Sequence, residues 1–297
     1  MLYRLNVLIA GLLTAVMLAP QAVLADRVTV GGKDFTEQLI MAAMTAELLD
    51  AEGYNVRKRD GMGSTVLRQA QVNGQIDVYW EYTGTSLITF NDEDAEGLTP
   101  DETFAKVKEL DAEKGLVWLG PSAANNTYAL AVAEGDEHMA HIRTLSDMAA
   151  AFRDGEDVTM AVNAEFPQRD DGLIGLQEAY DFNVPRGQRS TMDTGLTYQA
   201  LNEGQVDIAL VFATDGRIAA FDFVVLEDDK NFFPDYALAP VIRRDTLERN
   251  PQLEELLNDL ADRIDETTMQ TLNKQVDVDG DSPEEVAARF LRDQGLI

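Results

Sequence analysis

The chain has 297 residues, contains no cysteine and carries 53 acidic against 24 basic side chains, a formal net charge of −29. This charge argues against a nucleic acid partner, because binding phosphates requires a basic surface. Without cysteine there is no disulfide, so stability must come from the core. A mature length of about 270 residues is typical of two domains that each bury a core.

The amino terminus has the pattern of a secretory signal peptide. A basic start over residues 1–4 precedes an uncharged apolar stretch over residues 5–18, and Val23-Leu24-Ala25 is a small-residue cleavage pattern. The alternative, a retained membrane anchor, is disfavoured because the apolar stretch is shorter than the roughly 20 residues that span a bilayer. We therefore predict a signal peptide over residues 1–25 and a periplasmic mature chain.

The first predicted strand and helix bring a lysine to a helix N-terminus. Residues 27–30 alternate as a strand, and apolar side chains recur at helical spacing from residue 39 to about residue 50. Asp34 and Glu37 fit a capping box for this helix. Lys33 thus stands where backbone N–H groups favour anions, although a lysine at the surface is usually only solvated.

A short apolar strand is predicted over residues 76–80, after a helix over residues 64–72. It leads directly into Tyr82-Thr83-Gly84-Thr85, so the ring of Tyr82 and the hydroxyl of Thr85 arrive together at a strand end. Open α/β sheets bind their ligands at such ends.

Parts of the first half recur later at an offset of 130 residues, the difference between positions 199 and 69. The repeated pairs are Val28-Thr29-Val30 with Val158-Thr159-Met160, Gln69-Ala70 with Gln199-Ala200, and Gly74-Gln75-Ile76-Asp77-Val78 with Gly204-Gln205-Val206-Asp207-Ile208. At the same offset Tyr82 corresponds to Phe212. Two similar halves, each ending a strand with an aromatic residue, predict two facing lobes with an aromatic-lined cleft.

Two segments are predicted to cross between the lobes, residues 120–126 outward and residues 232–241 on the return. The first leads into a strand near Tyr128, and the second contains Tyr236. We predict an α/β fold of the two-lobed periplasmic binding protein kind (type II, Venus-flytrap), with the two crossing strands as a hinge. The predicted parts are lobe one over residues 26–126, lobe two over 127–236, and a C-terminal part of lobe one over 237–297.

Arg169 lies in a loop of lobe two that is rich in turn residues and carboxylates. Two interpretations stay open for it, a salt bridge to Asp170 or Asp171 and contact with a ligand. The two histidines, His138 and His141, have a spacing that could share a metal, but no third ligand is in view. We predict neither a metal nor a cofactor.

Recognition is favoured over catalysis, because the chain has no cysteine, no histidine in a candidate site and no Gly-x-Ser-x-Gly elbow. Asp77 and Glu81 would lie about 13 Å apart on a strand that rises roughly 3.3 Å per residue, too far for a glycosidase pair. Each aromatic residue at a strand end or crossing is, alone, more often part of a core. Together they suit a methylated ammonium, whose diffuse charge is poorly hydrated. These residues are Tyr82, Tyr128, Phe212 and Tyr236.

Six motifs are spread over the mature chain: Gly32-Lys33-Asp34-Phe35-Thr36-Glu37-Gln38, Val72-Asn73-Gly74-Gln75-Ile76-Asp77, Glu81-Tyr82-Thr83-Gly84-Thr85, Asn125-Asn126-Thr127-Tyr128-Ala129-Leu130, Thr214-Asp215-Gly216 and Ala239-Pro240-Val241. Together they resemble the glycine betaine/choline-binding proteins of osmoprotectant ABC importers, the OpuAC-like family. The resemblance implies that Asn126 is a polar side chain beside a cage that holds the ligand's ammonium group. It implies the cage itself at Tyr82, Tyr128, Phe212 and Tyr236, and a site for the ligand carboxylate at Lys33, Thr85 and Arg169.

The chain departs from the family pattern at two of these positions. Phe212 stands where members commonly have Tyr, which keeps the π face but removes a hydroxyl. Asn126 stands where some members have Asp, which removes a negative charge that would help hold the cation. Both departures bear on the affinity and the exact ligand, and not on the ligand class.

We predict the monomeric, non-enzymatic solute-binding component of an ABC importer, which delivers a quaternary-ammonium osmolyte to a membrane permease. Lys33, Thr85 and Arg169 favour glycine betaine or a similar betaine, because choline has no carboxylate for them to bind. The alternatives are choline or carnitine in the same fold, another anionic solute such as an amino acid or sulfonate, and an exported hydrolase that uses paired carboxylates.

Overall fold

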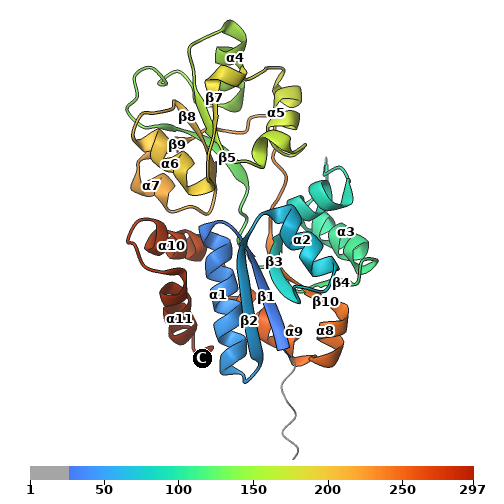
Figure 1. The fold of residues 1–297 in the computed structure, drawn as a ribbon. Coiled ribbons are helices and arrows are strands. Elements are labelled where there is room, and N and C mark those ends of the chain that lie inside the picture. The colour runs from blue at the N-terminus through green and yellow to red at the C-terminus, as the bar shows by residue number, and fades with distance from the viewer. Residues whose placement is uncertain (1–26, 96) are drawn as a thin grey trace, which may run out of the picture.

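The computed structural model describes residues 27–95 and 97–297. They form two lobes, of which one holds both ends of the described chain and the other holds its middle (Figure 1). The predicted signal peptide lies outside the described residues. Within the described ranges, no helix combines the length and the apolar character needed to cross a membrane.

Lobe one is built on a five-stranded sheet with the order β2-β1-β3-β10-β4. The strands are β1 (Arg27–Lys33), β2 (Asn55–Met62), β3 (Val78–Tyr82), β4 (Leu116–Trp118) and β10 (Leu238–Arg243). Its helices are α1 (Thr36–Ala51), α2 (Ser64–Val72), α3 (Pro100–Ala112), α8 (Arg244–Arg249), α9 (Gln252–Ala261), α10 (Glu266–Asp277) and α11 (Pro283–Asp293). Strand β10 pairs antiparallel with β3, so the return of the chain completes the sheet that the first part began.

Lobe two has a five-stranded sheet with the order β7-β6-β8-β5-β9. The strands are β5 (Tyr128–Ala133), β6 (Met160–Val162), β7 (Arg189–Thr191), β8 (Ile208–Phe212) and β9 (Phe223–Val225). Its helices are α4 (Leu145–Asp154), α5 (Leu173–Tyr180), α6 (Thr194–Asn202) and α7 (Arg217–Ala220). As in lobe one, three parallel strands are joined by an antiparallel strand that pairs with the central one. The two lobes therefore share one topology.

The 130-residue repeat has a counterpart in hydrogen bonding. The Asp77 carboxylate accepts a hydrogen bond from the backbone N–H of Thr29 at 2.7 Å, and Asp207 accepts the equivalent bond from Thr159 at 2.7 Å. In each lobe this bond fixes the start of the central strand against its parallel neighbour. The repeated sequence thus encodes the same strand register twice.

The two segments that connect the lobes pair with each other. Asn125 and Ala237 form an antiparallel bridge, and the Asn126 N–H donates to the carbonyl oxygen of Tyr236 at 3.2 Å. The predicted crossing segments are therefore neighbours in the structure. We keep 126/127 and 236/237 as the proposed lobe boundaries.

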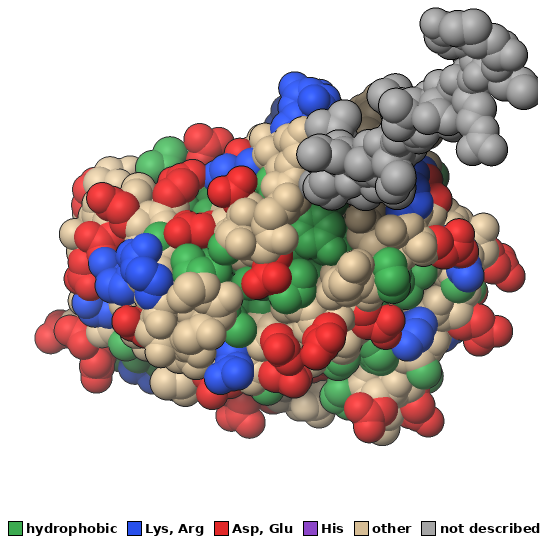
Figure 2. All heavy atoms as spheres, turned by 90° about the horizontal axis from the view of Figure 1, so that it is seen from below, with side chains coloured by type: hydrophobic (Ala, Val, Ile, Leu, Met, Phe, Trp, Pro, Cys, Tyr) green, Lys and Arg blue, Asp and Glu red, His purple; other side chains and the backbone are tan. Residues whose placement is uncertain are grey.

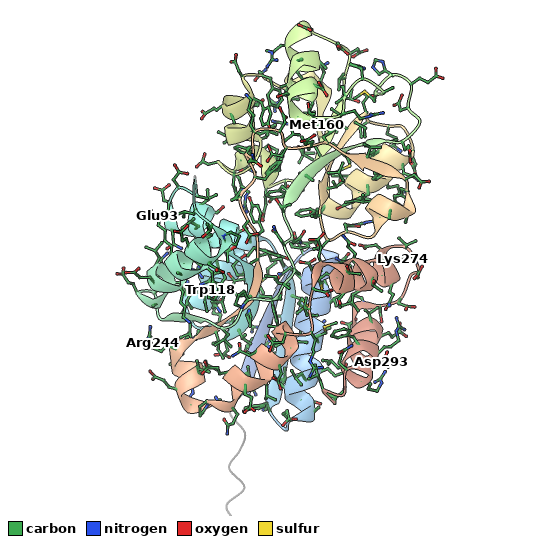
Figure 3. All side chains as sticks on the ribbon, turned by 180° about the vertical axis from the view of Figure 1, so that it is seen from behind. Glu93, Trp118, Met160, Arg244, Lys274 and Asp293 are labelled. Atoms are coloured by element: carbon green, nitrogen blue, oxygen red, sulfur yellow. The ribbon has the colours of Figure 1, made fainter. Side chains whose placement is uncertain are left out.

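Apolar side chains fill each lobe, and charged side chains cover it. Figure 3 shows the side chains from behind, with Trp118 in lobe one and Met160 in lobe two, both fully buried. The underside of lobe one carries many acidic side chains with Lys and Arg between them (Figure 2). The negative charge on this face is therefore a dispersed, solvated one.

Helix α1 does not begin with the predicted capping box. It begins at Thr36, and its N-cap residue is Phe35, which has no side-chain acceptor. Asp34 instead lines the cavity between the lobes, and the side chain of Glu37 is buried. The prediction is wrong because Glu37 turns inward to accept hydrogen bonds from Tyr82 and other distant residues rather than from its own helix.

A buried ion pair joins α2 to α3, and we expect the loss of one partner to destabilise lobe one. Asp111 pairs with Arg68 and accepts hydrogen bonds from the Ser86 hydroxyl at 2.9 Å and the Trp118 indole N–H at 2.7 Å. Replacing Asp111 with Asn should lower the free energy of unfolding by about 3 kcal/mol, because Arg68 then becomes a buried, unpaired cation. Urea denaturation at neutral pH measures this loss.

The contribution of Asp111 should depend on pH. Burial opposes its ionisation, but Arg68 and the neighbouring donors together hold the pKa of Asp111 below its ordinary value. A carboxyl with a depressed folded pKa stabilises fully above its unfolded pKa, about 4, and loses that contribution as the pH falls through the folded pKa. The stabilities of the wild type and Asp111→Asn should therefore converge in acid. If the difference in unfolding free energy between the wild type and Asp111→Asn were as large near pH 2 as at neutral pH, the ionised carboxylate of Asp111 would not be its source.

Candidate ligand-binding site

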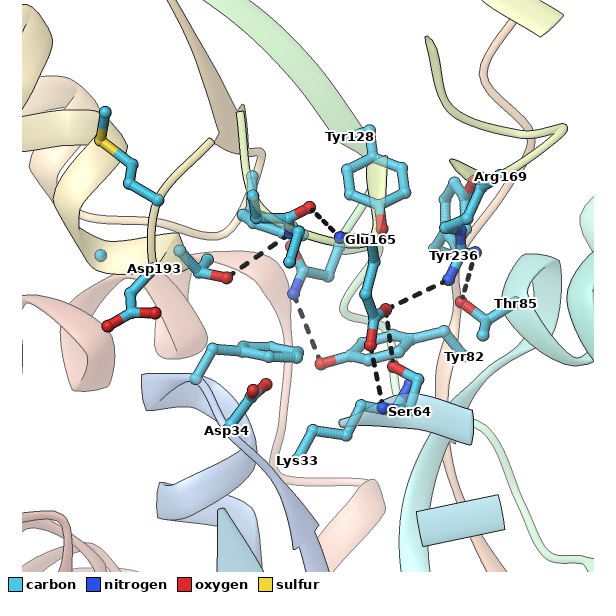
Figure 4. A pocket seen from close by; sticks show the side chains of 18 residues that line it. Lys33, Asp34, Ser64, Tyr82, Thr85, Tyr128, Glu165, Arg169, Asp193 and Tyr236 are labelled. Atoms are coloured by element: carbon cyan, nitrogen blue, oxygen red, sulfur yellow. Dashed lines mark hydrogen bonds and ion pairs between the residues drawn. The ribbon is translucent and has the colours of Figure 1, made fainter. Parts of the chain in front are cut away.

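A cavity of about 360 Å³ lies between the lobes and is lined by residues from both (Figure 4). This volume lies in the range of sites that bind small molecules. The structure brings all eight residues predicted from the sequence together around this one cavity: Lys33, Tyr82, Thr85, Asn126, Tyr128, Arg169, Phe212 and Tyr236.

Five aromatic rings, which we call the aromatic cage, form a continuous series of contacts along the cavity. The centroids of successive rings lie 6.2, 5.7, 5.2 and 5.6 Å apart in the order Tyr82, Phe35, Phe212, Tyr128 and Tyr236. The rings of Phe35 and Phe212 are nearly parallel at 11°, whereas Tyr236 meets Tyr128 edge-on at 78°. Rings from both lobes and from the return crossing therefore border the same space.

Strand pairing explains how these rings meet. Tyr82 ends β3 opposite Leu238 of β10, and Phe212 ends β8 opposite Tyr128 of β5. Strands β3 and β8 occupy the same place in the two sheets, with their carboxyl ends at the gap between the lobes. The 130-residue repeat thus delivers one aromatic ring to the cavity from each lobe.

Lys33 reaches the cavity with a partner already in place. Its ammonium lies 2.5 Å from a carboxylate oxygen of Glu81 and 4.8 Å from the centroid of the Tyr82 ring. Glu81 also accepts hydrogen bonds from the Tyr79 hydroxyl and the Tyr82 backbone N–H, each at 2.7 Å. Because an ammonium has three donors, Lys33 keeps hydrogen-bonding capacity beyond its bond to Glu81.

Arg169 forms a salt bridge with Asp171, as one of the two interpretations predicted, and its side chain also lines the cavity. Contact of Arg169 with a ligand stays a prediction. Its Nε donates to Asp171 at 2.7 Å, and its Nη2 contacts both Asp171 and the Thr85 hydroxyl, the latter at 3.2 Å. The guanidinium carbon lies 5.4 Å from the centroid of the Tyr128 ring, and the Tyr236 hydroxyl donates to Asp171 at 2.8 Å. One buried ion pair therefore contacts two cage tyrosines and reaches lobe one through Thr85.

Acidic side chains also line the cavity. The Glu165 carboxylate accepts hydrogen bonds from the backbone N–H and the hydroxyl of Ser64, each at 3.0 Å, and lies 3.7 Å from Arg169 (Figure 4). Asp34 and Asp193 lie on the same lining, and burial raises the pKa of Asp34 above its ordinary value. The cavity therefore presents negative charge beside its two cations.

The lining includes residues that sequence reasoning missed, and the repeat points to several of them. Phe35 follows Lys33 at the junction between strand and helix, but it was not among the predicted cage rings. Offsetting by 130 residues takes the lining residues Lys33, Asp34, Phe35 and Ser64 to Asn163, Ala164, Glu165 and Thr194, all of which line the cavity too. The same offset that related Tyr82 to Phe212 could therefore have found them.

A family model described as the substrate-binding domain of ABC-type glycine betaine transport systems, OpuAC, matches residues 26–293. The chain is 41% identical to a glycine-betaine-binding protein of Pseudomonas aeruginosa, over 92% of this chain and 89% of that protein. It is 34% identical to the glycine betaine-binding protein YehZ of Escherichia coli, over 96% of this chain and 95% of that protein.

Solved structures agree with this match. The crystal structure of a glycine betaine/carnitine/choline ABC transporter aligns with a TM-score of 0.72 and 30% identity, over 91% of this chain and 99% of that chain. The predicted two-lobed fold and the predicted family are both confirmed. The chain belongs to the OpuAC family, the substrate-binding domains of ABC-type glycine betaine transport systems.

Proposed function

We propose that this protein is the exported solute receptor of an ABC importer, and that it binds glycine betaine or a similar betaine between its lobes. The observation that carries the proposal is one cavity with an aromatic cage and two cationic side chains, Lys33 and Arg169. This arrangement matches a zwitterion with a methylated ammonium at one end and a carboxylate at the other. We propose a periplasmic, monomeric, non-enzymatic protein whose protein partner is the membrane permease.

The aromatic cage supplies the chemistry for the ammonium end. A quaternary ammonium cannot donate hydrogen bonds and is weakly hydrated, so several ring faces can replace its water at little cost. Each desolvated cation–π contact contributes on the order of 1–2 kcal/mol. Four or five such contacts supply roughly 4–10 kcal/mol before the cost of association is subtracted. The roughly −8 kcal/mol of a micromolar complex therefore requires the carboxylate contacts as well.

Arg169 and Thr85 supply the chemistry for the carboxylate end. They lie in different lobes and contact each other at 3.2 Å. A ligand carboxylate bound by both would hold the lobes together, which links binding to closure. Lys33 would add a charge-assisted hydrogen bond from the floor of lobe one.

A specific observation favours a second candidate, choline. Lys33 and Arg169 are paired with Glu81 and Asp171, so they offer less positive charge than two free cations would. The further carboxylates on the lining favour a ligand with net positive charge: Asp34, Glu165 and Asp193.

Calorimetry of the purified mature protein with glycine betaine, proline betaine, carnitine and choline tests the proposal. Micromolar or tighter binding of the betaines with much weaker choline binding supports the cage with its carboxylate site. Equal binding of choline would leave the cage standing and remove the proposed role of Lys33 and Arg169. Absence of heat with all four ligands would overturn the proposed function.

Phe35 should contribute to binding although it is not one of the predicted cage residues. Its ring lines the cavity and stacks on those of Tyr82 and Phe212, so it can contact the ligand and hold these two cage rings in place. Replacing Phe35 with Leu keeps the apolar volume and should raise the dissociation constant for glycine betaine about fivefold, or about 1 kcal/mol. Calorimetry measures this dissociation constant. Phe104→Leu serves as the control, because it removes an aromatic ring outside the cavity lining and should leave the affinity unchanged. An unchanged affinity in Phe35→Leu would mean that Phe35 contributes only to packing and not to ligand binding.

A further inference from the structure

Glu37 is a buried acid directly behind the aromatic cage, and it does not line the cavity. It lies in the first turn of α1. Its carboxylate accepts four hydrogen bonds, from the Tyr82 hydroxyl at 2.8 Å, Asn126 Nδ2 at 2.9 Å, the Thr214 hydroxyl at 2.5 Å and Asn273 Nδ2 at 3.3 Å. These donors belong to β3, to the first crossing, to the loop after β8 in lobe two and to α10. One carboxylate therefore contacts segments of both lobes and the first crossing between them.

The surroundings of Glu37 suit a negative charge that lacks a cationic partner. A carboxylate has about four acceptor positions, and four donors fill them here. Burial raises the pKa of Glu37, and the hydrogen bonds from Thr214, Tyr82, Asn273 and Asn126 oppose that rise. In the described ranges, no Lys, Arg or His side chain forms a salt bridge with Glu37. The Lys33 ammonium lies over the Tyr82 ring but is paired with Glu81, so a cation bound in the cage would add compensation for the charge of Glu37 through the same ring.

We propose that Glu37 is a positioning residue that makes the aromatic cage selective for a cationic head group over a neutral one of the same shape. The inference rests on the proposed function and deepens it, because it identifies the positive charge of the head group as the property of the ligand that the cage recognises. Glu37 acts through two side chains that do line the cavity, Tyr82 and Asn126.

Tyr82 is the first route. A phenol that donates a hydrogen bond to a carboxylate carries more electron density in its ring. The ring face attracts a cation through that electron density. Burial and the negative charge of Glu37 raise the pKa of Tyr82 well above its ordinary value, so the ring stays a neutral hydrogen-bond donor. Gln38 donates to the same hydroxyl at 3.1 Å and fixes its orientation.

Asn126 is the second route. Because Glu37 only accepts hydrogen bonds, it selects the nitrogen end of the Asn126 amide and turns the oxygen end away from itself. The Oδ1 of Asn126 has no hydrogen-bond partner among the described residues, and the side chain is buried on the cavity lining. On this proposal, the unpaired amide oxygen supplies partial negative charge beside a bound ammonium, at the position where the resemblance implies Asp in some members.

The test compares glycine betaine with 3,3-dimethylbutanoate, in which carbon replaces the ammonium nitrogen and the carboxylate is kept. The Glu37→Gln variant should bind glycine betaine about tenfold more weakly, whereas its affinity for the neutral-headed analogue, measured by competition, should change less than twofold. Glu47→Gln removes the same charge from the same helix outside the cavity lining and should change neither affinity. Equal weakening of both ligands by Glu37→Gln would mean that Glu37 only supports packing, and would overturn the inference.

A second variant keeps the test decisive where Glu37→Gln does not fold or the analogue binds too weakly. Tyr82→Phe retains the ring and Glu37 but breaks their hydrogen bond, and should weaken glycine betaine binding about threefold. Its affinity for 3,3-dimethylbutanoate should stay unchanged, so equal weakening of both ligands by Tyr82→Phe alone would overturn the inference. Where Glu37→Gln folds, the two substitutions should be non-additive in a double-mutant cycle, because both interrupt the same contact. Additive effects would overturn the route through Tyr82. If the wild-type protein does not bind glycine betaine at all, the proposed function itself is overturned, which is a different outcome from a failure of the inference about Glu37.

Discussion

Replacing Tyr82 with Leu is expected to raise the dissociation constant for glycine betaine about thirtyfold, or about 2 kcal/mol. The ring lies within the cavity lining and contacts Phe35, and the ammonium of Lys33 lies over it. Leucine fills much of the same volume with apolar atoms but has no π face. The substitution therefore removes the cation–π contact while keeping the hydrophobic contact, and calorimetry with the purified variant measures the difference.

A series at the same position separates the ring from its hydroxyl. Tyr82→Phe keeps the ring and should lose only about threefold, because the hydroxyl acts indirectly through Glu37. Tyr180→Phe is a matched control, since Tyr180 is also buried and its hydroxyl also donates to a carboxylate, that of Asp228 at 2.6 Å, but it lies outside the cavity lining. If Tyr82→Leu bound glycine betaine as tightly as Tyr82→Phe, the ring would serve only as packing, and the cage would lose its main support.

Replacing Arg169 with Gln is expected to weaken glycine betaine binding about a hundredfold and choline binding less than fivefold. Truncating one partner of a buried, charge-assisted contact typically costs 2–5 kcal/mol, which corresponds to this loss for a ligand that carries a carboxylate. Choline has no carboxylate, so its affinity should change only through the effect of Arg169 on the neighbouring cage ring of Tyr128. Calorimetry with the two ligands on one variant gives the comparison directly.

The chain offers a close control for this variant. Arg217 is also mostly buried, pairs with an aspartate two residues away and lies over a tyrosine ring, but it does not line the cavity. Arg217→Gln should therefore disturb folding to a similar degree and leave both affinities unchanged. Equal losses for betaine and choline in Arg169→Gln would show that Arg169 orders the cage and does not bind the carboxylate.

Local pattern and the repeat predicted the parts of the site that lie at strand ends. Tyr82 and Phe212 follow apolar strands in both halves, and the shared topology of the two lobes makes their strands equivalent. Residues whose position depends on the ends of strands and on crossings could therefore be placed without coordinates. The family resemblance supplied Lys33, Thr85 and Arg169, which spacing alone did not assign.

The ion pairs of the site could not be read from local spacing. Lys33 and Glu81 are 48 residues apart and meet because β1 and β3 are parallel neighbours, paired in the register that sets Val30 beside Val78. The same separation recurs in the hydrogen bond between Thr29 and Asp77. The register depends on tertiary packing, so the partner of Lys33 became evident only in the folded chain.

Glu37 shows how a local rule fails at a functional position. Its spacing from Asp34 fits a capping box, and a cap at the first turn is the ordinary use of such a pair. The side chain instead turns inward, because donors from four distant segments converge on it in the folded state. Nothing in the local sequence records that convergence.

The crystal structure of the complex with glycine betaine tests the central claim most directly. We expect the ammonium nitrogen within about 6 Å of the ring centroids of Tyr82, Tyr128, Phe212 and Tyr236, and the carboxylate within hydrogen-bonding distance of Arg169. A ligand bound outside the cavity, or with its ammonium away from the rings, would contradict the account.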